Sequence, residues 1–253
     1  MPAPVRPDDL VRLLRSGESA TPRLIWHAPG ERIELSGRVL ATWASKIADL
    51  LQEEFEAGVG STVLLDGSPH WRLMAWALGG WTVGATVVTC ADPDSGTSVR
   101  PSGPVDVLVA DGSRFAAGEV DIEAETLVGL TRAALARTSP VPLPAGVVDE
   151  ASTVLTYADQ VEPYDRAEDD DLALDGATTT TYAHLIRPAA AERVHLSGAQ
   201  PLAEVLVQAA SIWAAGGSAV LTDPAWEATQ GGDPSSGDFA QTLRSEGVSA
   251  LRD

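Results

Sequence analysis

The sequence has little positive charge, almost no lysine and a single cysteine. Its 253 residues carry 17 Lys and Arg against 36 Asp and Glu, a formal net charge of −19. Because a surface of this charge repels phosphates and anionic lipids, we expect neither nucleic-acid binding nor binding to a membrane surface. The single cysteine, Cys90, excludes an intramolecular disulfide and any metal site built from several cysteines.

Long apolar runs are also missing. No stretch approaches the roughly 20 apolar residues of a membrane span, and the first residues lack the apolar core of a signal peptide. We therefore expect a cytoplasmic protein. The hydrophobic fraction of 44% argues against general disorder. We expect one domain over 1–253, with subregions of about 1–138 and 147–253 joined by a Pro-rich connection at 139–146.

The compact catalytic motifs are absent as well. The sequence has no G-x-S-x-G, no H-E-x-x-H and no G-x-x-x-x-G-K-[ST], so no catalytic residue is predicted from these patterns. Its four histidines are too scattered to predict a metal site. The acidic run Glu168 to Asp171 could hold a hard cation, but without a calcium-loop pattern we expect a solvated charge run.

Hydrophobic patterning predicts alternating strands and helices. A strand, a helix and a second strand between residues 62 and 90 predict a right-handed parallel crossover. The expected fold class is therefore α/β, a layered parallel-sheet scaffold with flanking helices. Strands are predicted at 23–27, 32–36, 62–65, 86–90, 105–110, 126–130, 172–174, 193–196, 219–222 and 248–251, and helices at 38–55, 69–81, 181–191, 201–215 and near residue 240, with a loop at 92–104.

A polar turn follows the predicted strand 62–65. It consists of Asp66, Gly67 and Ser68, with Ser68 and Pro69 as the expected cap and first residue of the next helix. Parallel α/β sheets place ligands at the carboxyl ends of their strands, so this turn is a candidate ligand-facing turn. The alternative is a capped helix start that binds nothing.

Several segments, taken in order, resemble the N-terminal part of the adenylate-forming superfamily, which includes the AMP-binding acyl-CoA synthetases. The predicted helix 38–55 and the run Gly58 to Leu65 resemble the family's helix and G-V-G-x-x-D-x-V-x-L segment. The run Ser68 to Pro93 resembles N-S-P-E-W … A-G-A-V-x-V-P-L-D-P, and 202–221 resembles the later helix and A-G-A-x-V-V-L strand. The chain is similar to a short bacterial relative of these enzymes, and the resemblance implies the fold of a truncated N-terminal domain.

The resemblance also points to a degenerate phosphate loop. Where the family has T-S-G-T-T-G-x-P-K-G, this sequence has a threonine run that lacks the second glycine, the proline and the lysine. Backbone N–H groups and hydroxyls there could hold an anion weakly, so at most weak binding of ATP or AMP is implied. The vestigial phosphate-loop candidates are Gly176, Ala177, Thr178, Thr179, Thr180 and Thr181.

Other family motifs are not found in the sequence. These are the Y-G-x-T-E motif for adenine and magnesium, the ribose-binding aspartate and the catalytic lysine of the C-terminal domain; the sole lysine, Lys46, lies on an early helix. The resemblance therefore implies a pseudoenzyme that acts as a binding or regulatory module. Two alternatives stay open, one half of a split ligase and a nucleotide-binding protein that uses the threonine run. A homodimer or protein partner is expected to cover the apolar face of a truncated scaffold.

Overall fold

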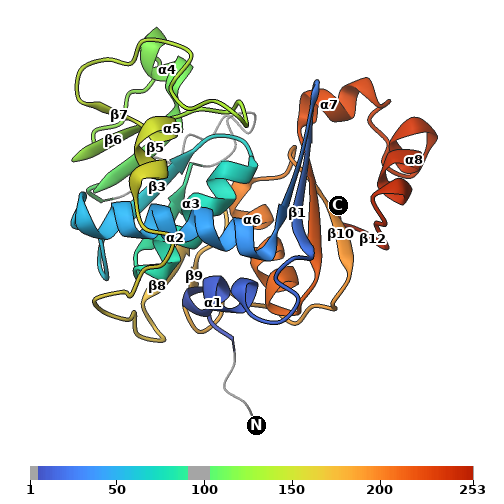
Figure 1. The fold of residues 1–253 in the computed structure, drawn as a ribbon, viewed down its shortest axis with the longest axis horizontal. Coiled ribbons are helices and arrows are strands. Elements are labelled where there is room, and N and C mark those ends of the chain that lie inside the picture. The colour runs from blue at the N-terminus through green and yellow to red at the C-terminus, as the bar shows by residue number, and fades with distance from the viewer. Residues whose placement is uncertain (1–4, 91–102, 253) are drawn as a thin grey trace.

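The computed structural model describes residues 5–90 and 103–252, and it contains two mainly parallel sheets (Figure 1). The loop predicted at 92–104 falls almost entirely outside the described residues. The smaller sheet has the order β12–β10–β11–β1–β2, with β1 (Pro22–Ala28), β2 (Glu31–Ser36), β10 (Arg193–Ser197), β11 (Ser218–Thr222) and β12 (Ala250–Arg252). The larger has the order β7–β6–β5–β3–β4–β8–β9, with β3 (Thr62–Asp66), β4 (Thr86–Thr89), β5 (Val107–Asp111), β6 (Thr126–Leu130), β7 (Val147–Asp149), β8 (Leu172–Asp175) and β9 (Thr180–Thr181).

Parallel pairing dominates both sheets. In the larger sheet β3 pairs in parallel with β4 on one side and with β5 on the other, and only β9 runs antiparallel, as a hairpin with β8. In the smaller sheet only β2 is antiparallel, in the predicted hairpin with β1. The α/β class and the parallel crossover from β3 to β4 are therefore confirmed. None of the described helices is long and apolar enough to cross a bilayer.

Two helices, α2 and α3, lie between the sheets and form the centre of the core (Figure 1). All residues of α3 are buried, and α2 buries one side against it. A Cβ at Gly79 would lie 2.6 Å from Ile47, so only glycine permits this close approach of the two helices. The helices are η1 (Pro7–Asp9), α1 (Leu10–Arg15), α2 (Gly37–Glu53), α3 (Trp71–Thr82), α4 (Gly112–Ala117), α5 (Glu150–Thr153), η3 (Val154–Thr156), α6 (Leu202–Ala214), α7 (Pro224–Thr229) and α8 (Gly237–Ser245).

The helix predicted at 181–191 is wrong. Thr180 and Thr181 form β9, and residues 182–186 make only turns before an irregular segment. The backbone N–H groups of His184 and Leu185 both bond to the carbonyl of Thr181, which is a single turn. Pro188 prevents its continuation because proline has no N–H and disfavours helical geometry in the residue before it. The paired β-branched threonines favour the strand.

The predicted start of α3 is also wrong by two residues. His70, not Ser68, caps the helix: its Nδ1 accepts a hydrogen bond of 3.2 Å from the backbone N–H of Arg72. Ser68 instead bonds to the side chain of Arg132 across the sheet edge. Ser68 was an attractive cap by residue type, but its hydroxyl is used in a tertiary contact.

Sheet membership does not follow the Pro-rich connection at 139–146. The strands β7 and β8 come after it and join the larger sheet with β3 to β6, while β1 and β2 come before it and join the smaller sheet. The connection itself forms turns and extended backbone next to β7. Each sheet therefore contains strands from both of the expected subregions.

Candidate functional site

The carboxyl ends of the parallel strands in both sheets point to the same side of the molecule, where α4 and α7 begin (Figure 1). In the larger sheet the chain moves from β3 to β4 in one direction and then to β5 in the other, so the strand order reverses at β3 and β5. Crevices at such reversals are the usual ligand sites of open α/β sheets. This edge is therefore the candidate site.

The predicted turn Asp66, Gly67 and Ser68 lies at this reversal. A carboxylate oxygen of Asp66 is 2.8 Å from a guanidinium nitrogen of Arg114 in α4, the helix that follows β5. The Nη2 of Arg132, which follows β6, donates to the Ser68 hydroxyl at 3.3 Å, and its Nε donates to Asp111 at 2.9 Å. The polar side chains of the turn are thus bonded to neighbouring loops, and their role toward a ligand stays a prediction.

The candidate phosphate-loop residues form the β8–β9 hairpin at the same edge. The Thr179 hydroxyl donates to Asp175 at 2.8 Å, and the Thr181 hydroxyl lies 3.0 Å from Nδ1 of His184. The hairpin is tight against β4, because a Cβ at Gly176 would lie 2.1 Å from the Thr89 hydroxyl. Residues 175–181 include a carboxylate, Asp175, and no Lys or Arg.

The end of β4 separates the hairpin from the turn after β3. Cys90 lies there, half-buried, and burial together with the nearby Asp66 carboxylate raises the pKa of its thiol to about 12. A thiol with this pKa stays protonated at neutral pH and is a poor nucleophile. The structure thus brings the two predicted segments to one edge, with an unreactive cysteine between them.

A cleft of about 310 Å³ lies where the carboxyl ends of the two sheets meet. His70 forms part of its wall, and its ring packs edge-on against Trp26 at a centroid distance of 4.9 Å. Burial, reinforced by the nearby charges of Arg132 and Arg72, holds the pKa of His70 well below its usual value, so the ring is neutral. The lining residues are Trp26, Ala28, Pro29, Gly30, Glu31, His70, Arg132, Ala133 and Asp223.

Sequence reasoning missed the charged residues of this cleft, which are Glu31, Arg132 and Asp223. Arg132 and Asp223 each come just after a strand that ends at this edge, and Glu31 opens β2. That signal was present in the sequence. It was not decisive, because many polar residues follow strands and only the packing of two sheets brings these three together.

A buried ion pair lies beneath the carboxyl edge, between α3 and α5. Arg72 Nη1 donates to both carboxylate oxygens of Glu150, at 2.8 and 2.9 Å, and both side chains are almost completely buried. The guanidinium lies over the rings of Trp43 and Trp71, 4.9 and 4.6 Å from their centroids. Burial raises the pKa of Glu150, although the Arg72 charge opposes this. The pair joins the first turn of α3 to α5.

The sole lysine lies away from this edge. Lys46 Nζ is 2.7 Å from the Asp159 carboxylate and donates to the backbone carbonyl of Tyr157, both in the segment that crosses α2. No group of three or more His, Cys, Asp or Glu side chains suited to a metal occurs among residues 5–90 and 103–252. Arg114 and Arg132, the arginines that contact the turn after β3 and the end of β5, are both ion-paired.

Comparison with known proteins identifies the fold. No protein-family model matches the sequence. A TIGR03089 family protein of Mycobacterium tuberculosis is 32% identical over 149 residues, 56% of this chain and 56% of the relative. An acyl-CoA synthetase from Brucella canis superposes on 98% of this chain, and the match covers 47% of that enzyme, with 15% identity and a TM-score of 0.69.

The match lies in the N-terminal part of such proteins. The N-terminal domain of FACL13 from Mycobacterium tuberculosis superposes on 86% of this chain and over 57% of its own, with 13% identity and a TM-score of 0.58. The chain thus spans about half the length of the curated relative and of the synthetase that it matches. Over that half, it has the fold of the N-terminal domains of acyl-CoA synthetase-like enzymes.

Proposed function

We propose that this chain is a catalytically degenerate relative of the AMP-binding, acyl-CoA synthetase-like enzymes that acts as a binding or regulatory module. The fold and the order of its strands support a relationship to adenylate-forming ligases. The chemistry at the carboxyl edge supports the loss of adenylation.

The β8–β9 hairpin, which we align with the family's phosphate loop, has no cationic side chain. The hydroxyls of Thr179 and Thr181 contact Asp175 and His184 within the chain. Polyphosphate transfer requires positive groups that stabilise the charge developing on the phosphoryl oxygens. The hairpin instead carries the Asp175 carboxylate, which accepts from Thr179. Arg114 and Arg132, the cations across β3 and β5, are paired with Asp66 and Asp111.

The 310 Å³ cleft between the sheets is where we place ligand binding. It has the size of a small-molecule pocket and combines an aromatic wall with a few charged groups. Its neutral, buried His70 can only exchange a proton well below neutral pH, which disfavours a role as general base. A module that binds without turnover fits this chemistry better than an enzyme does.

The test is titration calorimetry of the purified chain with ATP and with AMP, each with and without Mg²⁺, together with a carboxylate-dependent pyrophosphate exchange assay. We expect no exchange and at most millimolar binding, unaffected by Mg²⁺. The Thr179→Ala variant serves as the control for the hairpin and should leave any residual affinity unchanged. Release of AMP and pyrophosphate from ATP by the chain would refute the proposal.

A second candidate rests on the coverage of the relatives, since the chain matches about half of each. In this case the chain forms one half of a split ligase, and a partner protein supplies the remaining motifs. Co-purification from cell extracts at native expression would then recover a stable complex with pyrophosphate exchange activity. A chain that migrates alone, or as a homodimer, and stays inactive supports the first proposal.

A further inference from the structure

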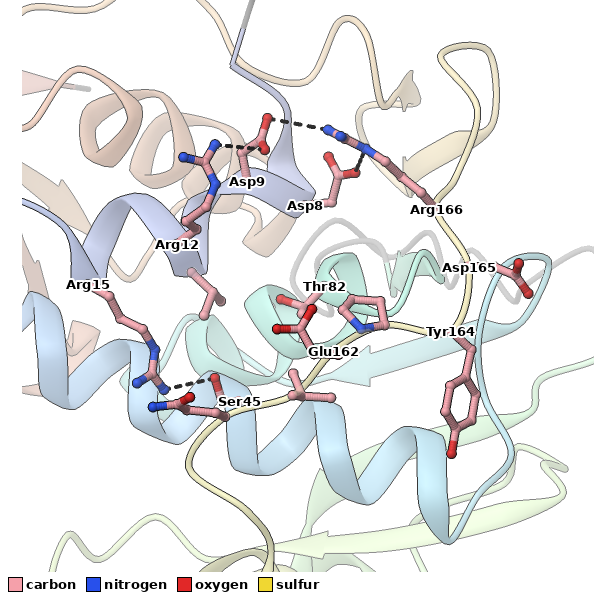
Figure 2. Close-up of a pocket in the computed structure, with 14 residues that line it drawn as sticks. Asp8, Asp9, Arg12, Arg15, Ser45, Thr82, Glu162, Tyr164, Asp165 and Arg166 are labelled. Atoms are coloured by element: carbon pink, nitrogen blue, oxygen red, sulfur yellow. Dashed lines mark hydrogen bonds and ion pairs between the residues drawn. The ribbon is translucent and has the colours of Figure 1, made fainter.

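A second cleft lies near the amino ends of the strands of the larger sheet, between α1 and the segment 160–166 (Figure 2). Its volume is about 750 Å³. Thr82 ends α3 and Arg166 precedes β8, so the cleft lies beside the amino ends of the strands and apart from the candidate site. The lining residues are Asp8, Asp9, Val11, Arg12, Arg15, Ser45, Thr82, Gln160, Val161, Glu162, Pro163, Tyr164, Asp165 and Arg166.

Four of the seven charged side chains that line this cleft form ion pairs with one another. Arg166 bonds to Asp8 at 2.7 Å and lies 3.5 Å from Asp9, and Arg12 bonds to Asp9 at 3.1 Å. These contacts close the upper rim in Figure 2. Both aspartates of η1 are therefore already ion-paired. The charges available to a ligand are those of Arg15, Glu162 and Asp165.

Arg15 is the cation that remains. Its Nη2 donates to the Ser45 hydroxyl at 3.0 Å and to the backbone carbonyls of Ala41 and Asp159, which are all neutral acceptors. No carboxylate among the described residues forms an ion pair with Arg15. The Asp159 carboxylate is bound by Lys46 at 2.7 Å, and the charge of Arg15 makes only a smaller contribution to the lowered pKa of Asp159. The Nε and Nη1 atoms of Arg15 make no hydrogen bond within the described chain, so two donors are free for a ligand.

Glu162 and Asp165 are the carboxylates that remain, on the wall opposite α1. Both side chains are exposed, and neither forms an ion pair with a described residue. Figure 2 shows Glu162 between the arginines of α1 and the ring of Tyr164. Val11, Val161 and Pro163 add apolar surface to the same cleft. The cleft thus holds one unpaired cation and two unpaired carboxylates on opposite walls, with apolar side chains nearby.

We infer that this cleft binds a small zwitterion, an α-amino acid with an apolar side chain. Its carboxylate accepts hydrogen bonds from Arg15, and its ammonium group pairs with Glu162. A nucleotide or another polyanion would face Glu162 and Asp165, and a simple cation would leave Arg15 without a counter-charge. The apolar side chain of the amino acid packs against Val11 and Pro163.

The experiment uses three probes that share one side chain and differ in charge. L-Leucine carries both charges, N-acetyl-L-leucine only the negative charge and L-leucinamide only the positive charge. We expect calorimetry with the full chain to give an affinity for L-leucine about tenfold higher than for either single-charge analogue, because each loses one charge-assisted hydrogen bond. Equal affinities for all three, or no binding of L-leucine in the millimolar range, would overturn the inference.

The variant Glu162→Gln isolates the ammonium contact. Its side chain is exposed and makes no hydrogen bond within the described residues, so the protein should fold normally. Affinity for L-leucine should fall to that for N-acetyl-L-leucine, whose own affinity should not fall. The matched control, Glu123→Gln, removes the same charge from an exposed loop away from the cleft and should change neither value. A loss of L-leucine affinity that is equal in both variants would count against the proposed contact.

Discussion

In the larger sheet, the charged side chains near the carboxyl ends of the strands differ in their ion pairing from those near the amino ends. At the carboxyl edge the three arginines that the geometry brings together are ion-paired: Arg114 with Asp66, Arg132 with Asp111, and, deeper, Arg72 with Glu150. The carboxylates of Glu31 and Asp223 at the same edge accept hydrogen bonds from backbone N–H groups instead. At the amino edge the cleft beside α1 keeps Arg15 and Glu162 without an ion-pair partner among the described residues. The carboxyl edge lies where ligands usually bind in such sheets, whereas the cleft at the amino edge has the unpaired charges that a charged ligand needs.

The difference shows that fold position and site chemistry are separate properties. A scaffold can retain a crevice at a strand-order reversal after its polar groups have become internal contacts. An arginine that is already ion-paired within the chain binds an anionic ligand less tightly, because the ligand must first displace the carboxylate that is in place. Mutations that break paired and unpaired charges should therefore have effects of very different size.

The largest effect is expected at the buried pair. Replacing Glu150 by Gln leaves the Arg72 guanidinium buried with no counter-charge, so the free energy of unfolding should fall by about 3–5 kcal/mol. Urea denaturation measures the change. The double variant Arg72→Met, Glu150→Leu should recover most of the loss, since it removes the unpaired charge. A single-variant loss below about 1 kcal/mol would contradict the assignment of a desolvated ion pair.

The next effect is steric and concerns the hairpin. Gly176→Ala places a Cβ 2.1 Å from the Thr89 hydroxyl, so β8 and β4 must separate, at a cost of about 1–3 kcal/mol in unfolding free energy. Thermal denaturation measures the loss. Adding Thr89→Ser keeps the hydroxyl and should rescue little, whereas Thr89→Ala removes that oxygen and should rescue part. No loss in Gly176→Ala would show that the hairpin is not held against β4.

A smaller, pH-dependent effect is expected in the other sheet, where Glu246 pairs with Arg32 and His27. The hydrogen bond from Arg32 is the main cause that lowers the pKa of Glu246 below 4.5. This contribution to stability is fully present above pH 4.5 and is lost as the pH falls through the lower pKa of the folded state.

Glu246→Gln tests this pairing. At pH 7 the variant should be less stable by about 1–2 kcal/mol, because it loses a charge-assisted hydrogen bond. The difference from the unmodified chain should shrink as the pH falls below 4.5. Burial also lowers the pKa of His27, so protonation of that ring in the unfolded chain adds a loss of stability at acid pH in both proteins. A difference that stays constant with pH would contradict the pairing.

The smallest effect is expected at the unpaired carboxylate. Glu162→Gln breaks no ion pair among the described residues and reduces the negative charge of a chain that carries −19. Its midpoint of thermal unfolding should be unchanged or slightly raised at low salt, and any gain should vanish at high salt because salt screens the repulsion. A marked loss of stability would show that Glu162 has a structural partner.

Much of the fold follows from local sequence patterns. The β1–β2 hairpin is marked by Pro29 and Gly30, the helix α2 by its apolar stripe, and β3, β6, β10 and β11 by short runs that contain Val and Leu. In each case the residues that set the element are neighbours in sequence. The helix expected at 181–191 was wrong because pairing with β8 outweighed the weak helical pattern, and Pro188 stopped it.

The sequence by itself determined the class of the fold, the lack of a lysine in the threonine run and the strong negative charge. These properties depend on residue identity and on spacings of a few residues. The tertiary structure alone decided which charges are neutralised: Ser68 bonds to a residue 64 positions away and Arg72 to one 78 positions away. Arg15 and Glu162 face one cleft because the segment 160–166 crosses α2, and no local pattern encodes that long-range packing.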